Sequence, residues 1–155
     1  MSTQGDHPGV ITHPPVLYGI ALILGAAIDV FVPLPLLDPE TGPVVGLGLV
    51  AVGFVLAGWC AVLFVRAGTN VPTHRPSTAL VTHGPYRFSR NPIYVALTAI
   101  SVGIGLWANS AWMVGLILPT LVVMQVGVIE REERYLEEKF GDEYREYKAR
   151  VRRWL

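Results

Sequence analysis

The sequence predicts an all-α integral membrane protein with about four transmembrane helices, the last two forming a hairpin before a C-terminal amphipathic helical segment. Hydrophobic residues occupy 52% of the 155 positions and charged residues only 15%, which is unusual for a soluble protein of this size. Residues 44–65 carry no charged side chain, and a helix of about 20 residues crosses the hydrocarbon core. A soluble bundle of very apolar helices is the alternative, but apolar runs of this length argue against it.

Four apolar segments account for the predicted spans, and the whole chain, 1–155, is expected to be one membrane domain. The first span contains Asp29 and is interrupted by Pro33 and Pro35, which predict that its helix ends or bends near them. Polar segments at 1–15, 66–92 and 130–155 complete the chain. The expected spans are 16–37, 44–65, 93–107 and 111–129.

The basic residues are confined to two segments of the chain. All twelve Lys and Arg lie either between Arg66 and Arg90 or between Arg131 and Arg153. Two predicted spans separate these segments, so both lie on one side of the membrane, and the positive-inside rule makes that side cytoplasmic. The connection 38–43 is acidic and is expected outside. The formal net charge is zero, which gives no reason to propose nucleic-acid binding.

A polar, turn-rich stretch at 83–94 reads His-Gly-Pro-Tyr-Arg-Phe-Ser-Arg-Asn-Pro-Ile-Tyr and leads directly into the third span. Its two prolines bias the residues before them away from helix. Non-helical backbone at membrane depth must be buried in protein or line a wet cavity, because lipid offers no hydrogen bonds. We therefore expect this stretch to line a pocket.

The fourth span continues without a breaker into a charged helix. At 100° per residue, Ile129, Leu136 and Phe140 form one stripe, flanked on its two sides by Glu132 and Glu133. These two glutamates are the acidic residues expected to face the protein body. A fully solvated juxtamembrane helix is the alternative.

The turn-rich stretch 83–94 supplies basic side chains, and Glu132 and Glu133 supply carboxylates on the same side of the membrane. Together they suit a ligand that carries both a positive and a negative charge. S-adenosylmethionine is such a ligand, since its carboxylate can pair with Arg90 or Arg87 and its amino group or ribose with Glu132 or Glu133. The rings of Tyr86 and Tyr94 can flank its adenine or sulfonium. Spacing alone leaves other ligands open.

Two motifs resemble those of a known family. Gly84-Pro85-Tyr86-Arg87 followed by Arg90-Asn91-Pro92-Ile93-Tyr94 resembles the signature of the isoprenylcysteine carboxyl methyltransferase family and its bacterial relatives, which are similar to phospholipid methyltransferases. The tail is similar as well. It holds Glu132-Glu133, Leu136, Phe140-Gly141, Tyr144, Tyr147 and Val151…Arg153-Trp154. Both motifs, in order and separated by one helical hairpin, make a fairly specific match.

The resemblance implies a small S-adenosylmethionine-dependent membrane methyltransferase whose lipophilic acceptor, with a carboxylate, thiol or amine head, enters from the bilayer. Arg90 and Glu133 are the expected catalytic residues, in the sense of positioning. Asn91 replaces the histidine of eukaryotic members, Ala96 a common glycine and Arg152 the usual proline. The implied cofactor-binding residues are His83, Tyr86, Arg90, Asn91, Pro92, Tyr94, Glu132 and Glu133.

Several alternatives stay open. A carboxylate acceptor needs no general base, whereas a thiol or ammonium acceptor must first lose a proton, and Glu133, His83 or Asp29 could accept it. Asp29 is equally consistent with a water-accessible residue at the outer interface. A membrane reductase using NADPH and a non-catalytic membrane interaction module are the competing functions. No metal site is expected, and the protein is expected in a bacterial or archaeal cell membrane.

Overall fold

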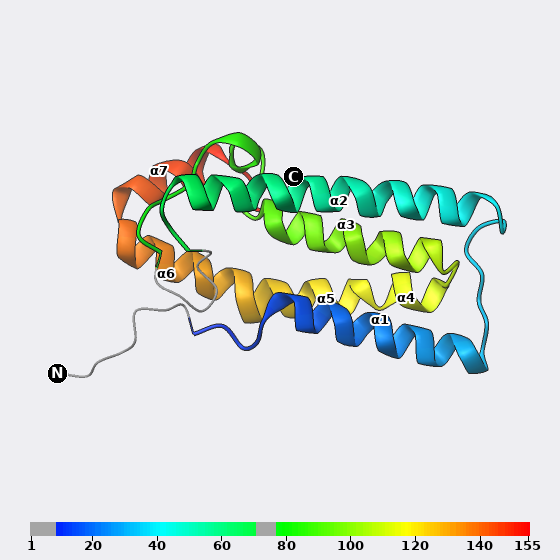
Figure 1. The fold of residues 1–155 in the computed structure, drawn as a ribbon. Coiled ribbons are helices and arrows are strands. Elements are labelled where there is room, and N and C mark those ends of the chain that lie inside the picture. Colours follow the sequence, from blue (N-terminus) through cyan, green and yellow to red (C-terminus); the bar gives the residue numbers. More distant parts are fainter. Residues whose placement is uncertain (1–8, 71–76) are drawn as a thin grey trace.

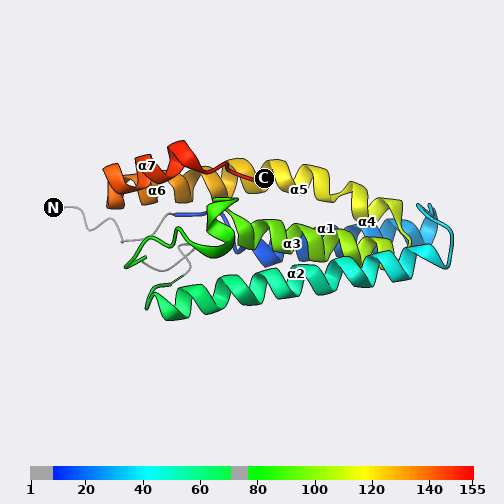
Figure 2. The same cartoon turned by 90° about the horizontal axis from the view of Figure 1, so that it is seen from above.

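The computed structural model describes residues 9–70 and 77–155, and within these residues every regular element is a helix. Long apolar helices form the body of the molecule: α1 (Pro14–Phe31), α2 (Thr41–Arg66), the shorter α3 (Pro92–Trp107) and a stretch from Ala111 to Phe140. They lie side by side (Figures 1 and 2). The all-α membrane fold, with its last two helices as a hairpin, is confirmed.

The helix of the first span ends just before Pro33, as its two prolines predict, and is therefore shorter than the apolar segment 16–37. Helix α1 ends at Phe31, and residues 32–37 form a non-helical connection, because Pro33 and Pro35 have no backbone N–H to continue it. Asn109, in the turn after α3, holds this connection. Its Oδ1 accepts hydrogen bonds from the backbone N of Leu36 and Leu37, at 3.0 and 2.9 Å.

Helices α2 and α3 approach until their backbones touch. A Cβ atom added to Gly46 would lie 2.4 Å from the backbone N of Trp107, and one added to Gly103 would lie 2.7 Å from the carbonyl O of Gly46. No side chain fits in either place. Small residues on facing surfaces are the usual way in which membrane helices pack, and this contact carries α3 close along α2.

The final long stretch is one continuous rod with a change of winding. It comprises α4 (Ala111–Gly115), α5 (Ile117–Met124), the π-helical turn η2 (Gln125–Ile129) and α6 (Glu130–Phe140). Gly141 then adopts a positive φ of 55°, which favours glycine. The chain reverses there into α7 (Asp142–Arg150), which lies against α6 (Figure 2).

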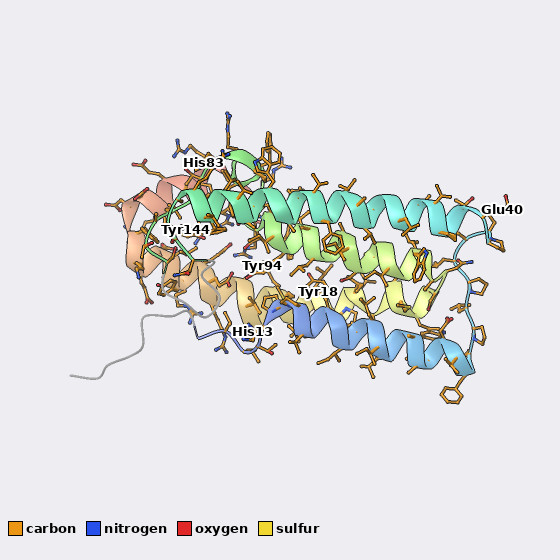
Figure 3. The ribbon with its side chains drawn as sticks, viewed as in Figure 1. His13, Tyr18, Glu40, His83, Tyr94 and Tyr144 are labelled. Carbon is orange, nitrogen blue, oxygen red and sulfur yellow. The ribbon has the colours of Figure 1, made fainter. Side chains whose placement is uncertain are left out.

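Both basic segments lie at the same end of the bundle. The short 3₁₀ helix η1 (Gly84–Arg87), α6 and α7 gather there, and the acidic connection between α1 and α2 lies at the other end (Figure 1). Figure 3 shows His83 and Glu40 at these opposite ends. The even number of spans between the two basic segments agrees with the charge pattern of the sequence.

Candidate functional site

A cavity lies at the basic end, where η1 and the start of α3 face α6 and α7. Its volume is about 50 Å³, so it is small. Six of the residues predicted to bind a cofactor line it, although they come from segments some forty residues apart. They are Tyr86, Arg90, Asn91, Tyr94, Glu132 and Glu133.

The segment η1 places Tyr86 in the wall of this cavity. Gly84 has a positive φ of 63°, and the turn that it begins buries Tyr86 with its ring edge-on to Phe64, at a centroid distance of 5.7 Å. The hydroxyl of Tyr147 donates to the carbonyl O of Tyr86 at 2.8 Å. Burial raises the pKa of Tyr86 well above its ordinary value, so this phenol stays neutral.

Glu133 is the charged centre of the site. Only 6% of the residue is exposed. Arg153 binds it with two parallel bonds, from Nε to Oε1 at 3.0 Å and from Nη2 to Oε2 at 2.8 Å. This is the bidentate geometry in which Arg holds a carboxylate most strongly. The guanidinium of Arg90 lies 3.1 Å from Oε1 as well, so one carboxylate faces two cations.

Arg90 has unused hydrogen-bonding capacity. Its side chain is 9% exposed, and its Nε and Nη1 are buried without a hydrogen-bond partner among the described residues. The contact between Nη1 and Glu133 is therefore an ion pair without hydrogen-bond geometry. Buried donors are almost always satisfied, so two unsatisfied guanidinium nitrogens beside the cavity make Arg90 a candidate to bind an anionic ligand group or water.

Glu132 is held by a tyrosine from α3. The hydroxyl of Tyr94 donates to its Oε1 at 2.6 Å, and both residues are buried. Tyr94 lies at the cavity end of the bundle, as does Tyr144 of α7 (Figure 3). This bond ties the start of α3 to α6 and sets the orientation of the carboxylate.

The last residues of the chain are bound to the loop before α3. The backbone N of Arg90 donates to the carbonyl O of Arg152 at 2.8 Å, and Asn91 Nδ2 donates to that of Arg153 at 3.0 Å. Because Arg152 contributes its carbonyl, the contact does not need the proline that the resemblance leads one to expect there. Trp154 Nε1 donates to Gln125 Oε1 at 3.1 Å.

Two predicted residues lie away from the cavity. His83 is exposed and precedes η1. Pro92 begins α3 and lines a separate apolar hollow with Trp59 and Phe88. The structure therefore does not bring either residue to the cavity, and a cofactor role for them stays a prediction.

Three further residues of the site belong to the tail motif but were not among the predicted cofactor-binding residues. Arg153 neutralises Glu133, whereas Tyr144 and Tyr147 of α7 line the cavity. Burial raises the pKa of Tyr144 to about 12, partly opposed by Arg90. The tail motif, which contains all three residues, and the apolar face of α7 were the available signals, but amphipathicity alone does not say what a helix covers.

Asp29 lies at the opposite end of the bundle. Its Oδ1 accepts hydrogen bonds from Ser110 Oγ at 2.9 Å and from the backbone N of Leu34 at 3.3 Å. These bonds join the end of α1 to the start of α4, so Asp29 has a structural role there. Within the described part of the chain, no three metal-ligating side chains come together.

Comparison with known proteins places this site in a family context. A family model described as phospholipid methyltransferase matches residues 42–143, a range that includes η1, α3 and both glutamates. An uncharacterized protein of Haemophilus influenzae is 52% identical over 64 residues, which are 41% of this chain and 100% of that protein. No solved structure matches the chain.

Two further relatives carry names from metal resistance. The cobalt-zinc-cadmium resistance protein CzcN of Cupriavidus metallidurans is 31% identical over 107 residues, which are 68% of this chain and 45% of CzcN. The nickel-cobalt-cadmium resistance protein NccN of Alcaligenes xylosoxydans xylosoxydans is also 31% identical over 107 residues, or 68% of this chain and 46% of NccN. The match thus spans less than half the length of these two relatives.

Proposed function

Since the chain belongs to the phospholipid methyltransferase family, we propose that it transfers a methyl group from S-adenosylmethionine to a lipophilic acceptor that enters from the bilayer. The observation that carries the proposal is Arg90, whose buried guanidinium has two unsatisfied nitrogens beside a pair of buried glutamates. The family match supports the reaction class, and the donor and acceptor are our inference.

The cavity residues suit the methyl donor. Arg90 suits its carboxylate, and the carboxylate of Glu132, oriented by Tyr94 on the cavity wall, suits its amino group or ribose hydroxyls. Leu80, Val81 and other apolar side chains in the wall suit an adenine ring. Because the cavity holds about 50 Å³, its walls must move apart when a ligand of this size binds.

S-adenosylmethionine supplies a methyl group activated by a sulfonium. The protein's part is then to hold donor and acceptor in reactive geometry and to exclude water. Both oxygens of Glu133 are engaged by Arg153, and Oε1 also faces Arg90, which suits a positioning role. A carboxylate acceptor needs no base. For an acceptor that must lose a proton, we propose the bonded Tyr94–Glu132 pair in the cavity wall as the base.

An apolar groove supports a lipophilic acceptor. It lies between α2, α3 and α5, reaches Gln125 and Trp154, and has a volume of about 590 Å³, which is in the range of small-molecule sites. Its lining is aliphatic except near Thr98, Gln125 and the indole of Trp154. We propose that the apolar chain of the acceptor lies here, with its head directed toward the cavity.

The direct test is binding of S-adenosylmethionine to the full chain in neutral detergent by calorimetry. We expect binding by the wild type and loss of binding in Arg90→Gln, because the variant keeps a polar side chain but removes the cation. Arg134→Gln, on the exposed face of α6, is the matched control. No binding of the donor or its demethylated product by folded wild type at millimolar concentration contradicts the proposal.

The acceptor requires a second experiment. Labelled S-adenosylmethionine is incubated with the protein and with membrane lipids, lipophilic thiols or lipophilic acids, and the labelled product is identified. Filling the groove with Ala99→Phe should abolish transfer while calorimetric binding of the donor persists. If the variant transfers as fast as the wild type, the acceptor does not use this groove.

A further inference from the structure

A second hollow lies beside the cavity, between the end of η1 and the end of α7. Its volume is about 340 Å³, and Thr82, Arg87, Tyr147, Arg150 and Val151 line it. Tyr147 lines both spaces, so the hollow and the cavity are adjacent. Two of the five lining side chains are guanidinium groups, and none is a carboxylate.

The charges of these two arginines are not compensated. Neither Arg87 nor Arg150 forms an ion pair within residues 9–70 and 77–155, and Arg150 uses only Nε, which donates to the carbonyl O of Glu146 at 3.2 Å. On the same helix, Arg145 and Lys148 are paired with Glu137 at 3.4 and 3.0 Å. Thus α7 carries one neutralised side and one side with free positive charge. Two guanidinium groups facing one space suit the oxygens of a phosphate.

An apolar hollow of about 200 Å³ adjoins the other side of η1, and Trp59, Pro85 and Phe88 are among its lining residues. In a 3₁₀ helix, residues at i and i+3 lie on the same side, so Pro85 and Phe88 face this hollow while Arg87 lies about a third of a turn away. Phe88 is 74% exposed and Trp59 54% exposed. Exposed aromatic rings next to arginines are typical of the level of lipid headgroups.

We propose that the two hollows together bind one anionic phospholipid of the adjacent leaflet, with its phosphate between Arg87 and Arg150 and one acyl chain against Trp59 and Phe88. A free phosphate ion uses only the basic hollow and leaves the aromatic one without a role. An anionic lipid is favoured over a zwitterionic one, because a positive headgroup beside two uncompensated arginines is repelled. This site is separate from the methyl-transfer cavity and does not depend on the proposed reaction.

The test measures lipid binding to the full chain in neutral detergent by native mass spectrometry. The probes are dioctanoyl phosphatidylglycerol, dioctanoyl phosphatidylcholine and inorganic phosphate. We expect selective binding of phosphatidylglycerol, weakened about tenfold or more in Arg87→Gln and in Arg150→Gln, because each variant removes a charge-assisted hydrogen bond. Phe88→Ser should weaken the binding of phosphatidylglycerol as well, because it removes the apolar contact with the acyl chain.

Arg134→Gln is the control, because it removes the same charge from an exposed position on α6 and should leave the affinity unchanged. Thermal unfolding verifies that each variant is folded, and Arg87→Lys, which keeps the charge, should retain part of the affinity. Equal binding of phosphatidylglycerol by wild type and an Arg87→Gln, Arg150→Gln double variant overturns the proposal. The proposal is also overturned if Arg134→Gln weakens lipid binding as much as the Arg87 and Arg150 variants do, or if phosphatidylcholine binds as tightly as phosphatidylglycerol. Displacement of the lipid by millimolar inorganic phosphate overturns it as well.

Discussion

Glu133 connects the loop before α3 to the C-terminal residues. It receives Arg90 from the loop before α3 and Arg153 from the last residues. A buried ion pair adds little net stability when it is complete, but removal of one partner leaves an uncompensated charge. The side chain of Arg153 is 34% exposed, whereas that of Arg90 is 9% exposed. Water can therefore solvate Arg153 if Glu133 is removed, and Arg90 is the cation left without compensation.

Glu133→Gln should therefore lower both stability and ligand affinity. We expect the free energy of unfolding to fall by about 1–3 kcal/mol, since Arg90 and Arg153 lose the negative charge and one of the two acceptor oxygens that they face. Thermal unfolding in detergent and calorimetry with S-adenosylmethionine measure the two effects. Glu138→Gln, exposed on the same helix, should change neither, and equal behaviour of the two variants would mean that Glu133 has no special role.

The hydroxyl of Tyr94 can be tested against a matched tyrosine. Tyr94→Phe removes the bond to Glu132 at 2.6 Å, and Tyr18→Phe removes a bond to Thr98 at 2.8 Å outside the cavity. Both should lose about 1 kcal/mol of stability. Only Tyr94→Phe should weaken the binding of S-adenosylmethionine, about tenfold, because only this variant removes the bond that orients the carboxylate of Glu132. Similar affinities in the two variants would contradict this assignment.

Tyr144 predicts a pH dependence at the alkaline end. Burial raises its pKa to about 12, compared with about 10 for an unfolded tyrosine. The folded state thus holds this proton more tightly, and its contribution to stability is complete below pH 10 and is lost between about pH 10 and 12. The free energy of unfolding, measured across this pH range, should fall less steeply with pH in Tyr144→Phe than in the wild type. Identical slopes would exclude Tyr144 as a source of the dependence.

At the scale of elements, the winding of the last long helix decides which side chains reach the cavity. The π turn η2 lies immediately before α6, and such turns add a residue to the helix and often lie at functional sites. Glu132 and Glu133 are buried after this turn, and Arg131, Arg134 and Glu138 are exposed. The inward orientation of both glutamates, predicted from helical periodicity, is confirmed.

Deletion of Val126, which is 59% exposed, should convert η2 to ordinary α-helix. The rest of the rod then turns by about 100° relative to α5, which carries the two glutamates away from η1 and α3. We expect the protein to remain in the membrane fraction but to lose S-adenosylmethionine binding by calorimetry. Val126→Ala is the control at the same position and should bind normally. Retained binding in the deletion would show that the register of η2 is unimportant.

At the scale of the whole molecule, the basic end is expected in the cytoplasm. Cys60 is the only cysteine in the sequence and is fully buried. A Cys60→Ser variant therefore has no thiol, and single cysteines can be introduced into it as labelling sites. A membrane-impermeant thiol reagent added to intact cells should label Glu40→Cys and not Arg134→Cys, and permeabilised cells should allow both. The reverse pattern would place the cavity on the outer side.

The helices and their order were largely predictable, because an uncharged run of membrane length has few other solutions. The end of the first helix was predicted only in part, from its two prolines. Its apolar residues continue to Leu37, but α1 ends at Phe31, and the end depends on prolines and on Asn109 from the distant α3–α4 turn. Such long-range capping has no local signal in the sequence.

The sequence by itself determined the membrane fold, the common end of the two basic segments and the inward side of α6, because hydropathy and helical period are local properties of the chain. Only the tertiary structure decided that Arg153 neutralises Glu133, that Arg90 keeps unsatisfied donors, and that Arg87 belongs to a second hollow. These facts depend on how the final residues return to the loop before α3. Contacts between residues some sixty positions apart arise from packing and leave no periodic trace in the sequence.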